Sequence, residues 1–556
     1  MYTHGVVMAA FVGFAFLFPR FADSFFRPIE SICTRLAQKK ALAILSVALT
    51  AIFLRVALLW YVPVPYPKVP DEFSYLLAAD TFAHGRLTNP PHPMWQFFET
   101  FHVLQLPTYM SKYPPAQGAF LALGQLLGNP WLGVLLSMAA MYAAILWMLQ
   151  GWMPPQWALL GVILMLFRMG IFNYWVDSYW GGAVAALGGA LVMGAFPRIL
   201  QRQRPRDAIA LALGAGILAN SRPYEGFIFS LPVAFALIWW FSTRSRRISW
   251  GAKLLRIAAP AGLVLALILA FNAYYNWKVT GNPLELPYTA YTRQYDPLPL
   301  FVWQKIGPPK HFLNAQFDET YNHWTDHAAA PRMLDGNWRT PVHYVRESVS
   351  NIEAFFFRQE FLAAFILALP WLSRERKMRL PLAQLAFCTL GFSASAWSFS
   401  HYIAPVAATA FLLITQSFRH VRRFQFGNRP VGIGLTRALV LIALVRFCAQ
   451  AVAVDERTPY TPGEILVRFQ PPVTEQLEAL PGQQLIVVRY TPHHDTSEEW
   501  IHNRADIDRA KVVWARELPG INIQPLFNYF RGRQVWLLEP DIIPPRLSRY
   551  PGASPP

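Results

Sequence analysis

Val69-Pro70-Asp71-Glu72-Phe73-Ser74-Tyr75 follows an apolar run at 41–62 that is long enough to cross a bilayer. The stretch therefore places two carboxylates, Asp71 and Glu72, beside a membrane. Charged groups there are costly to desolvate and commonly serve a function. This pairing of an apolar span with an acidic outer loop indicates a membrane protein that does chemistry at its surface.

The composition supports the membrane assignment. Of the 556 residues, 54% are hydrophobic and 15% charged, and the mean hydropathy is +0.26. The net charge of +17 comes from basic residues in short links between apolar runs, which is how membrane orientation signals are arranged. No basic arm with interleaved aromatic residues is present, so nucleic-acid binding is excluded.

The apolar runs predict an α-helical polytopic membrane protein with about eleven transmembrane helices. Arg35, Lys39 and Lys40 place the start of the first span in the cytoplasm, and the later basic links fall on the same side. Counting the short run Ala116–Leu127 as a span would move the later basic links to the outer side, so we expect this run to lie at the outer surface. The expected spans are 41–62, 131–150, 156–172, 180–197, 208–220, 226–242, 256–276, 356–372, 381–399, 402–418 and 438–454.

Two domains are expected. The first, 1–454, is the transmembrane domain with outer loops 63–115 and 278–352, and its run Gly5–Phe18 predicts an interfacial helix or an extra span. The second, 455–556, is a small extracytoplasmic α/β domain. Its apolar runs predict a parallel three-stranded sheet with helical stretches around Ser497–Asn503 and Pro525–Phe530, the strands being 484–490, 511–515 and 534–538.

Two charged positions in the first outer loop are the leading candidates for chemistry. A carboxylate at Asp71 could accept a proton from an alcohol, while a solvated loop pair or a helix cap is the alternative for Asp71-Glu72. Lys112 precedes Tyr113-Pro114-Pro115, whose prolines restrict the backbone. A phosphate suits this ammonium, although a lysine reaching toward lipid headgroups is the simpler explanation.

Other outer turns carry further candidates. Arg222, in the turn 220–226, could form an ion pair with Glu225 or hold an anionic lipid head. Asp177 and Tyr179 lie among aromatic residues, which suits a sugar because its CH faces stack on rings. His401 lies at another outer boundary and is a weaker candidate for binding substrate.

Two arginines lie inside expected spans. Arg55 and Arg446 are costly in lipid, so each is expected to face the protein interior and form an internal ion pair. The fourth expected span has a face of small residues, which predicts close helix packing: Gly182, Ala186, Ala190 and Gly194.

At these residues the chain resembles the GT-C membrane glycosyltransferases, in particular the bacterial branch related to protein O-mannosyltransferases and lipid A aminoarabinose transferase. Asp71-Glu72 is similar to the acid pair of that family's first loop. Lys112-Tyr113-Pro114-Pro115 is similar to its Lys-Pro-Pro element, except that Tyr113 is interposed. Asp177 resembles a second acidic position in a later outer loop. The resemblance covers roughly the first 420 residues.

The resemblance implies inverting transfer of a hexosyl or pentosyl group from a polyprenyl-phosphate donor to an envelope lipid, glycan or protein. In it, Asp71 is the base, Lys112 and Arg222 bind the donor phosphate, and Glu72 orients Asp71 or helps to bind a divalent metal. The metal ligands are not identified. The expected location is the bacterial inner membrane, among membrane lipids. A transporter or flippase of lipid-linked sugars and a non-catalytic envelope scaffold are the alternatives.

Overall fold

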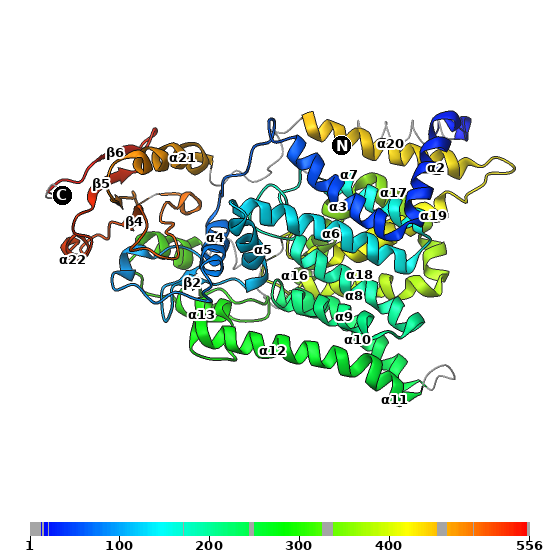
Figure 1. Cartoon of the computed structure of the whole chain (residues 1–556), viewed down its shortest axis with the longest axis horizontal. Helices are drawn as coiled ribbons and strands as arrows, with labels where there is room; N and C mark the ends of the chain where they lie inside the picture. The colour runs from blue at the N-terminus through cyan, green and yellow to red at the C-terminus, as the bar shows by residue number, and fades with distance from the viewer. Residues whose placement is uncertain are drawn as a thin grey trace.

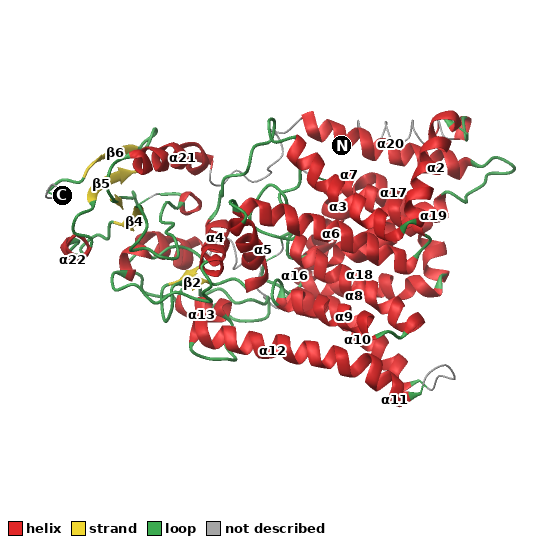
Figure 2. Cartoon of the chain, in the orientation of Figure 1, coloured by secondary structure: helices red, strands yellow, loops and turns green. Residues whose placement is uncertain are grey.

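The computed structural model describes residues 13, 16–20, 22–170, 172–243, 249–324, 337–397, 399–452, 464–492 and 494–552. The expected interfacial helix Gly5–Phe18 lies largely outside these residues. Helices fill one end of the molecule, and the larger sheet lies at the other end (Figure 2). The outer loops lie between the two ends.

Each expected span overlaps a helix. Within the described residues, six stretches are long and apolar enough to cross a bilayer, among them α6 and α8 and the continuous helix Trp250–Thr280. The molecule is thus a helical polytopic membrane protein, and the number eleven stays a prediction. The helices of this part are α2 (Asp23–Gln38), α3 (Lys40–Ala57), α6 (Pro130–Trp152), α7 (Pro155–Met169), α8 (Ala183–Arg202), α9 (Pro205–Ala219), α10 (Pro223–Ser242), α11 (Trp250–Lys253), α12 (Ala259–Thr280), α16 (Arg339–Ile352), α17 (Arg358–Arg374), α18 (Arg379–Phe392), α19 (Ala407–Val421) and α20 (Val431–Val452).

Helix α8 is at the centre of the helical core and packs against α6 and α9. Its small residues make this possible, as expected. A Cβ atom at Gly189 would lie 2.5 Å from the carbonyl oxygen of Pro405, and one at Gly194 would lie 2.3 Å from the Trp147 ring. Larger side chains would therefore push the helices apart.

Both arginines inside spans form internal ion pairs, as expected. Arg55 Nε lies 3.0 Å from Asp177 Oδ1, and Arg446 Nη1 lies 2.5 Å from Glu360 Oε2. Arg55 is fully buried and also donates to the carbonyl oxygens of Val62 and Pro63. Its charge is thus satisfied within the protein.

Two expected spans have different ends from those predicted. Helix α18 stops at Phe392 rather than near 399, and α19 begins at Ala407, after a short 3-10 turn at Ala404–Val406. The residues between the two helices form an irregular loop, which pairs with Phe301 through Ser395. Apolar composition alone could not reveal this loop, because its Ala, Trp and Phe residues match those of a span.

The outer loops contain short elements that surround the site. Loop 63–115 and the residues after it contain α4 (Pro70–Ala83), a 3-10 turn (Trp95–Phe98), β1 (Val103–Leu104), β2 (Met110–Ser111) and α5 (Pro115–Leu126). Loop 278–352 contains α13 (Pro287–Gln294), α14 (Ala315–Asp318) and a π-helical turn (Glu319–Trp324) before α16. Strands β1 and β2 pair antiparallel and bring His102 close to Lys112.

The C-terminal region forms a small α/β module, as expected. The strands β3 (Gln484–Val488), β4 (Val512–Arg516) and β5 (Gln534–Glu539) are parallel, with β3 in the middle, and β6 (Arg546–Arg549) adds an antiparallel edge that was not predicted. Helix α22 (Gln524–Tyr529) matches the prediction, and α21 (Glu464–Ala479) was missed. The expected helix at Ser497–Asn503 is wrong, because only a 3-10 turn at Thr496–Glu498 forms.

The module and the first outer loop share one hydrophobic core. Leu77, Phe98 and Val103 of the loop region are buried with Leu485 and Val513 of the sheet. Figure 1 shows α4 between the module and the helical bundle. The sheet therefore packs directly against the loop that carries Asp71.

Candidate active site

Asp71 lies in the first turn of α4. Val69 is extended and Pro70 occupies the first helical position, where a missing N–H costs nothing. Carboxylates in a first helical turn are favoured by the positive end of the helix dipole. The sequence Val-Pro-Asp thus fixes where the helix begins and where the acid is held.

Protein donors approach both oxygens of the Asp71 carboxylate. The hydroxyl of Tyr113 donates to Oδ1, and Nε2 of His102 lies 3.4 Å from Oδ2. Burial alone would raise the pKa of Asp71, but His102, Lys112 and Tyr113 outweigh it and hold the pKa below its usual range. Asp71 is therefore ionised at neutral pH and able to accept a proton.

Lys112 follows β2 and is almost fully buried, with 4% of its surface exposed. Its Nζ lies 4.6 Å from the ring centroid of Tyr291 and 4.8 Å from that of Tyr288, both on α13. Burial lowers the pKa of Lys112 to about 8, against the opposing charges of Asp296 and Asp71. Among the described residues its ammonium has ring faces for neighbours and no hydrogen-bond acceptor, so its donors are available to an anion.

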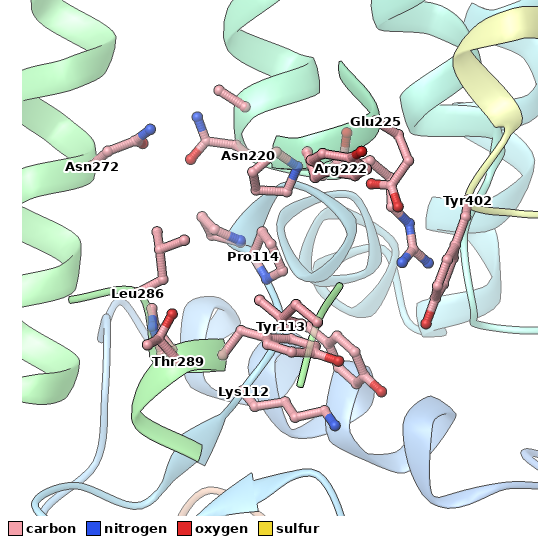
Figure 3. Close-up of a pocket in the computed structure, with 18 of the residues that line it drawn as sticks. Lys112, Tyr113, Pro114, Asn220, Arg222, Glu225, Asn272, Leu286, Thr289 and Tyr402 are labelled. Carbon is pink, nitrogen blue, oxygen red and sulfur yellow. The ribbon is translucent and has the colours of Figure 1, made fainter. Parts of the chain in front are cut away.

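Arg222 is the N-cap residue of α10 and lies on the other side of Tyr113 from Lys112 (Figure 3). Its guanidinium stacks 4.2 Å from the ring centroid of Tyr402. No carboxylate of the described residues lies within ion-pair distance of it, so the Arg222–Glu225 ion pair, one of the two alternatives for this turn, is not formed. Arg222 thus presents a second cation, with Glu225 nearby but not paired to it.

Lys112 and Arg222 line one cavity. Its volume is about 160 Å³, which is roughly ten times the space that a single water needs. The loop after α18, the start of α10 and the face of α12 close it, together with α13. Most of the remaining lining is aromatic or apolar, and it includes Tyr113, Pro114, Tyr224, Tyr275, Tyr288, Phe301, Trp397 and Tyr402.

Glu72 and Tyr179 are both hydrogen-bonded to backbone groups of neighbouring loops. Glu72 accepts hydrogen bonds from the backbone N–H groups of Lys68, at 3.0 Å, and Tyr179, at 2.8 Å. The Tyr179 hydroxyl donates to the carbonyl oxygen of Pro65. Both side chains are buried and hold the loop after α3 against the turn before α8. That Glu72 orients Asp71 or helps to bind a metal stays a prediction.

Asp177 and His401 also have protein partners. Asp177 forms the ion pair with Arg55 described above, and about a quarter of its side chain remains exposed. His401 is buried. Its ring forms a hydrogen bond of 3.0 Å with the hydroxyl of Tyr174 and stacks on Trp180. Its ring contacts Tyr402, which lines the cavity.

Several residues at the site were missed in the sequence. His102, Tyr288, Tyr291 and Asp296 come from segments without a motif, and they meet at Lys112 and Asp71 only in the folded chain. His102 carries one usable signal after folding, a positive φ of 65°, which non-glycine residues adopt rarely and often at functional sites. Within the described residues, no three His, Cys, Asp or Glu side chains are grouped to hold a metal ion.

The molecule has a polytopic helical fold that known membrane proteins share, and the resemblance set out above is confirmed at the level of the fold. One structure that shares it is ArnT from Cupriavidus metallidurans bound to undecaprenyl phosphate. The TM-score is 0.50 at 13% identity, over 90% of this chain and 93% of that chain. At this identity the similarity establishes the fold alone.

Other comparisons were weaker. The apo state of the same ArnT gives a TM-score of 0.49 at 13% identity, over 90% of this chain and 93% of that chain. The Archaeoglobus fulgidus oligosaccharyltransferase in complex with Zn and sulfate gives 0.44 at 13% identity, over 80% and 60%. No protein-family model and no curated protein sequence matches the chain.

Proposed function

We propose that the chain is an integral-membrane glycosyltransferase. It moves a sugar from a polyprenyl-phosphate donor to an envelope acceptor on the extracytoplasmic side of a bacterial inner membrane. The observation that carries the proposal is the meeting of an ionised carboxylate, Asp71, with a buried cation, Lys112, across Tyr113. ArnT, which has the same fold, was solved with undecaprenyl phosphate bound, and this supports the kind of donor.

The proposed step forms one bond and breaks one. The acceptor hydroxyl gives its proton to Asp71 while its oxygen attacks the anomeric carbon of the sugar. The bond from that carbon to the phosphate oxygen breaks, and its electron pair stays on the lipid phosphate. Attack opposite to the leaving group inverts the anomeric centre, whether the sugar is a hexose or a pentose.

Each charged residue then has a defined part. Asp71 is ionised because His102 and Tyr113 lower its pKa. A positioned base contributes about 10²–10⁴-fold to the rate. Lys112 and Arg222 neutralise the charge that grows on the departing phosphate, which is where fixed cations help most.

The charges and the arrangement of the chain support this location. The basic links favour a cytoplasmic start of α3, which would leave loops 63–115 and 278–352 and the module 455–556 outside. Helix α4, which carries Asp71, lies between the module and the helical bundle (Figure 1). No feature of the described site favours the flippase or scaffold alternative over transfer.

A reconstituted assay tests the proposal. The purified protein in lipid discs is given radiolabelled polyprenyl-phosphate sugars with envelope lipid or peptide acceptors, and product is counted. Asp71→Asn is expected to lose about 10²–10⁴-fold in rate because the proton acceptor is removed. Asp506→Asn, in an exposed pair with Arg509 at 3.7 Å, is the matched control and should keep the wild-type rate. Undiminished transfer by Asp71→Asn would contradict the proposal.

A further inference from the structure

The helix that carries Asp71 is held from outside by the C-terminal module. One short segment of the module, Trp500–Ala505, runs along α4 for two helical turns. At one end, the imidazole of His502 stacks on the ring of Phe73 with 3.5 Å between centroids and 5° between planes. At the other end, the backbone N–H of Ala505 donates to Asp80 Oδ2 at 2.8 Å.

A third contact fixes the same segment to the strand side of the loop. The hydroxyl of Tyr109, beside β2, donates to the carbonyl oxygen of Asn503 at 3.0 Å. Tyr109 is buried and lies three residues before Lys112. The segment therefore touches both the helix that carries the proposed base and the strand that leads to the proposed phosphate ligand.

The segment is itself rigidly attached to the sheet. The side chain of Asn503 exchanges two hydrogen bonds with the backbone of Trp514 in β4, at 2.7 Å and 2.9 Å. Glu499 forms a fully buried ion pair with Arg516 at the end of β4. Arg516 also donates to Gln316 of loop 278–352 at 2.9 Å, so the second outer loop is tied to the same strand. The position of His502 is thus set by the sheet.

We propose that His502 is a positioning residue for Asp71. It acts by pressing on Phe73, two residues along α4, and it makes the C-terminal module a working part of the active site. This inference rests on the proposed function, because it concerns the placement of the proposed base. The ring face, and not the charge, does the positioning.

Two further observations fit a role through the ring face. Burial lowers the pKa of His502 to about 4, so the ring is neutral at physiological pH and can lie flat on an apolar partner. Its Nε2 is buried without a hydrogen-bond partner among the described residues, so the polar contact of the ring is the one with the backbone of Glu499. An aromatic ring of similar size would keep the stacking on Phe73.

The tolerance for misplacement at a reacting group is small. A shift of about 1 Å can cost on the order of 100-fold in rate. We therefore expect His502→Ala to lower kcat about 10-fold or more, within that bound. The KM for the donor should stay near the wild-type value, because Lys112 and Arg222 are untouched.

Rescue and coupling separate positioning from a general loss of stability. His502→Phe restores a ring on Phe73 and should recover most of kcat. Phe73→Leu should lower kcat as His502→Ala does, and the double variant should be no worse than either, because contacting residues are not additive. His343→Ala, at an exposed position on α16, is the histidine control and should match wild type. Rates are divided by the folded fraction from thermal melting.

The outcomes are distinct. If His502→Ala keeps the wild-type kcat while Asp71→Asn is inactive, the positioning role is wrong and the proposed function stands. If His502→Phe is as slow as His502→Ala, or if the double variant shows the product of the two losses, the positioning role is also wrong. If Asp71→Asn is fully active, the proposed function itself fails. Should His502→Ala not fold, His502→Leu keeps the apolar volume without the ring and replaces it.

Discussion

The hydroxyl of Tyr113 donates a hydrogen bond to Asp71, a residue 42 positions earlier in the chain. Tyr113 is the residue by which the sequence departs from the Lys-Pro-Pro pattern of the family it resembles. Its ring also lies 5.4 Å from the ammonium of Lys112, measured to the ring centroid. Tyr113 therefore contacts both Asp71 and Lys112, the two charged residues on which the proposed transfer depends.

Tyr113→Phe should move the pH dependence of transfer. The variant keeps the ring that stacks on Tyr75 at 4.5 Å and removes only the donor to Asp71. A hydrogen bond to a charged group contributes about 1.5–3 kcal/mol, so the pKa of Asp71 rises toward its usual range. Because transfer needs ionised Asp71, the acidic limb of kcat/KM should shift to higher pH.

The matched control is Tyr529→Phe, which removes a surface bond of the same type, from the Tyr529 hydroxyl to Asp508. It should leave the profile unchanged. An acidic limb at the same pH in wild type and Tyr113→Phe would contradict the role given to this hydroxyl.

Donor binding should weaken at alkaline pH because Lys112 loses its charge. Its folded pKa is about 8, so the ammonium is present below that pH and is lost as the pH rises through it. The Kd for a polyprenyl phosphate, measured by titration calorimetry, should therefore increase above about pH 8. Lys112→Arg should flatten this rise, because a guanidinium stays charged.

Lys278→Arg, at an exposed lysine near the end of α12, serves as the comparison and should keep the wild-type curve. A wild-type Kd that does not change up to pH 10 would show that Lys112 does not bind the phosphate as an ammonium.

Asp177→Asn should damage stability and not substrate recognition. The substitution leaves the fully buried Arg55 without its anion, and breaking such a pair costs about 3–5 kcal/mol, less here because Asp177 is about a quarter exposed. The midpoint of thermal unfolding should fall while the donor KM stays constant.

Glu285→Gln, at a surface pair with Arg293 that is worth at most about 1 kcal/mol, should barely change the midpoint. A raised KM with an unchanged midpoint in Asp177→Asn would restore the sugar-binding role expected from the sequence.

Glu72→Gln should distinguish the role of Glu72 from that of Asp71. One of two backbone hydrogen bonds is lost, which costs about 1–3 kcal/mol of stability, while transfer per folded molecule persists because both oxygens of Glu72 already accept hydrogen bonds from backbone N–H groups. Burial raises the pKa of Glu72 from 4.5 to about 7, so the folded state holds the extra proton between these values. Stability contributed by Glu72 therefore falls as the pH rises across this window, and the variant should lack that slope.

The chemical denaturation midpoint between pH 4.5 and 7.5 measures this slope directly. Inactive but stable Glu72→Gln would instead indicate that Glu72 takes part in the reaction.

The sequence was sufficient for the membrane fold because apolar length and basic links depend on the bilayer and not on tertiary contacts. The internal ion pairs of Arg55 and Arg446 were predictable as well, since an arginine inside a span needs an anion within the protein. The partner of Arg55 was not predictable. The aromatic neighbours of Asp177 predict a sugar ligand and give no sign that a buried cation 122 positions away faces it.

The misses in the C-terminal module also have physical reasons. Helix α21 contains Pro471 and Pro472, which argue against a helix interior when only local sequence is considered. The segment Ser497–Asn503 has helical composition. However, Glu499 forms an ion pair with Arg516 and a hydrogen bond with Tyr490, and these contacts outweigh the local preference for a helix. At the site, Asp71 and Lys112 were found from motifs, whereas His102 and Tyr291 depend on strand pairing and on the placement of α13.

The core shared by Leu77 and Leu485 has a consequence for biogenesis. The two residues are separated by about 400 residues of nascent chain, and synthesis proceeds at about 5–20 residues per second. The first outer loop thus emerges roughly 20–80 s before the strand that covers it is made. During that interval its apolar side chains lack their partner, and the helix with the acid has no external support. A ribosome that stalls before the tail is finished would leave a membrane-inserted but incompetent protein.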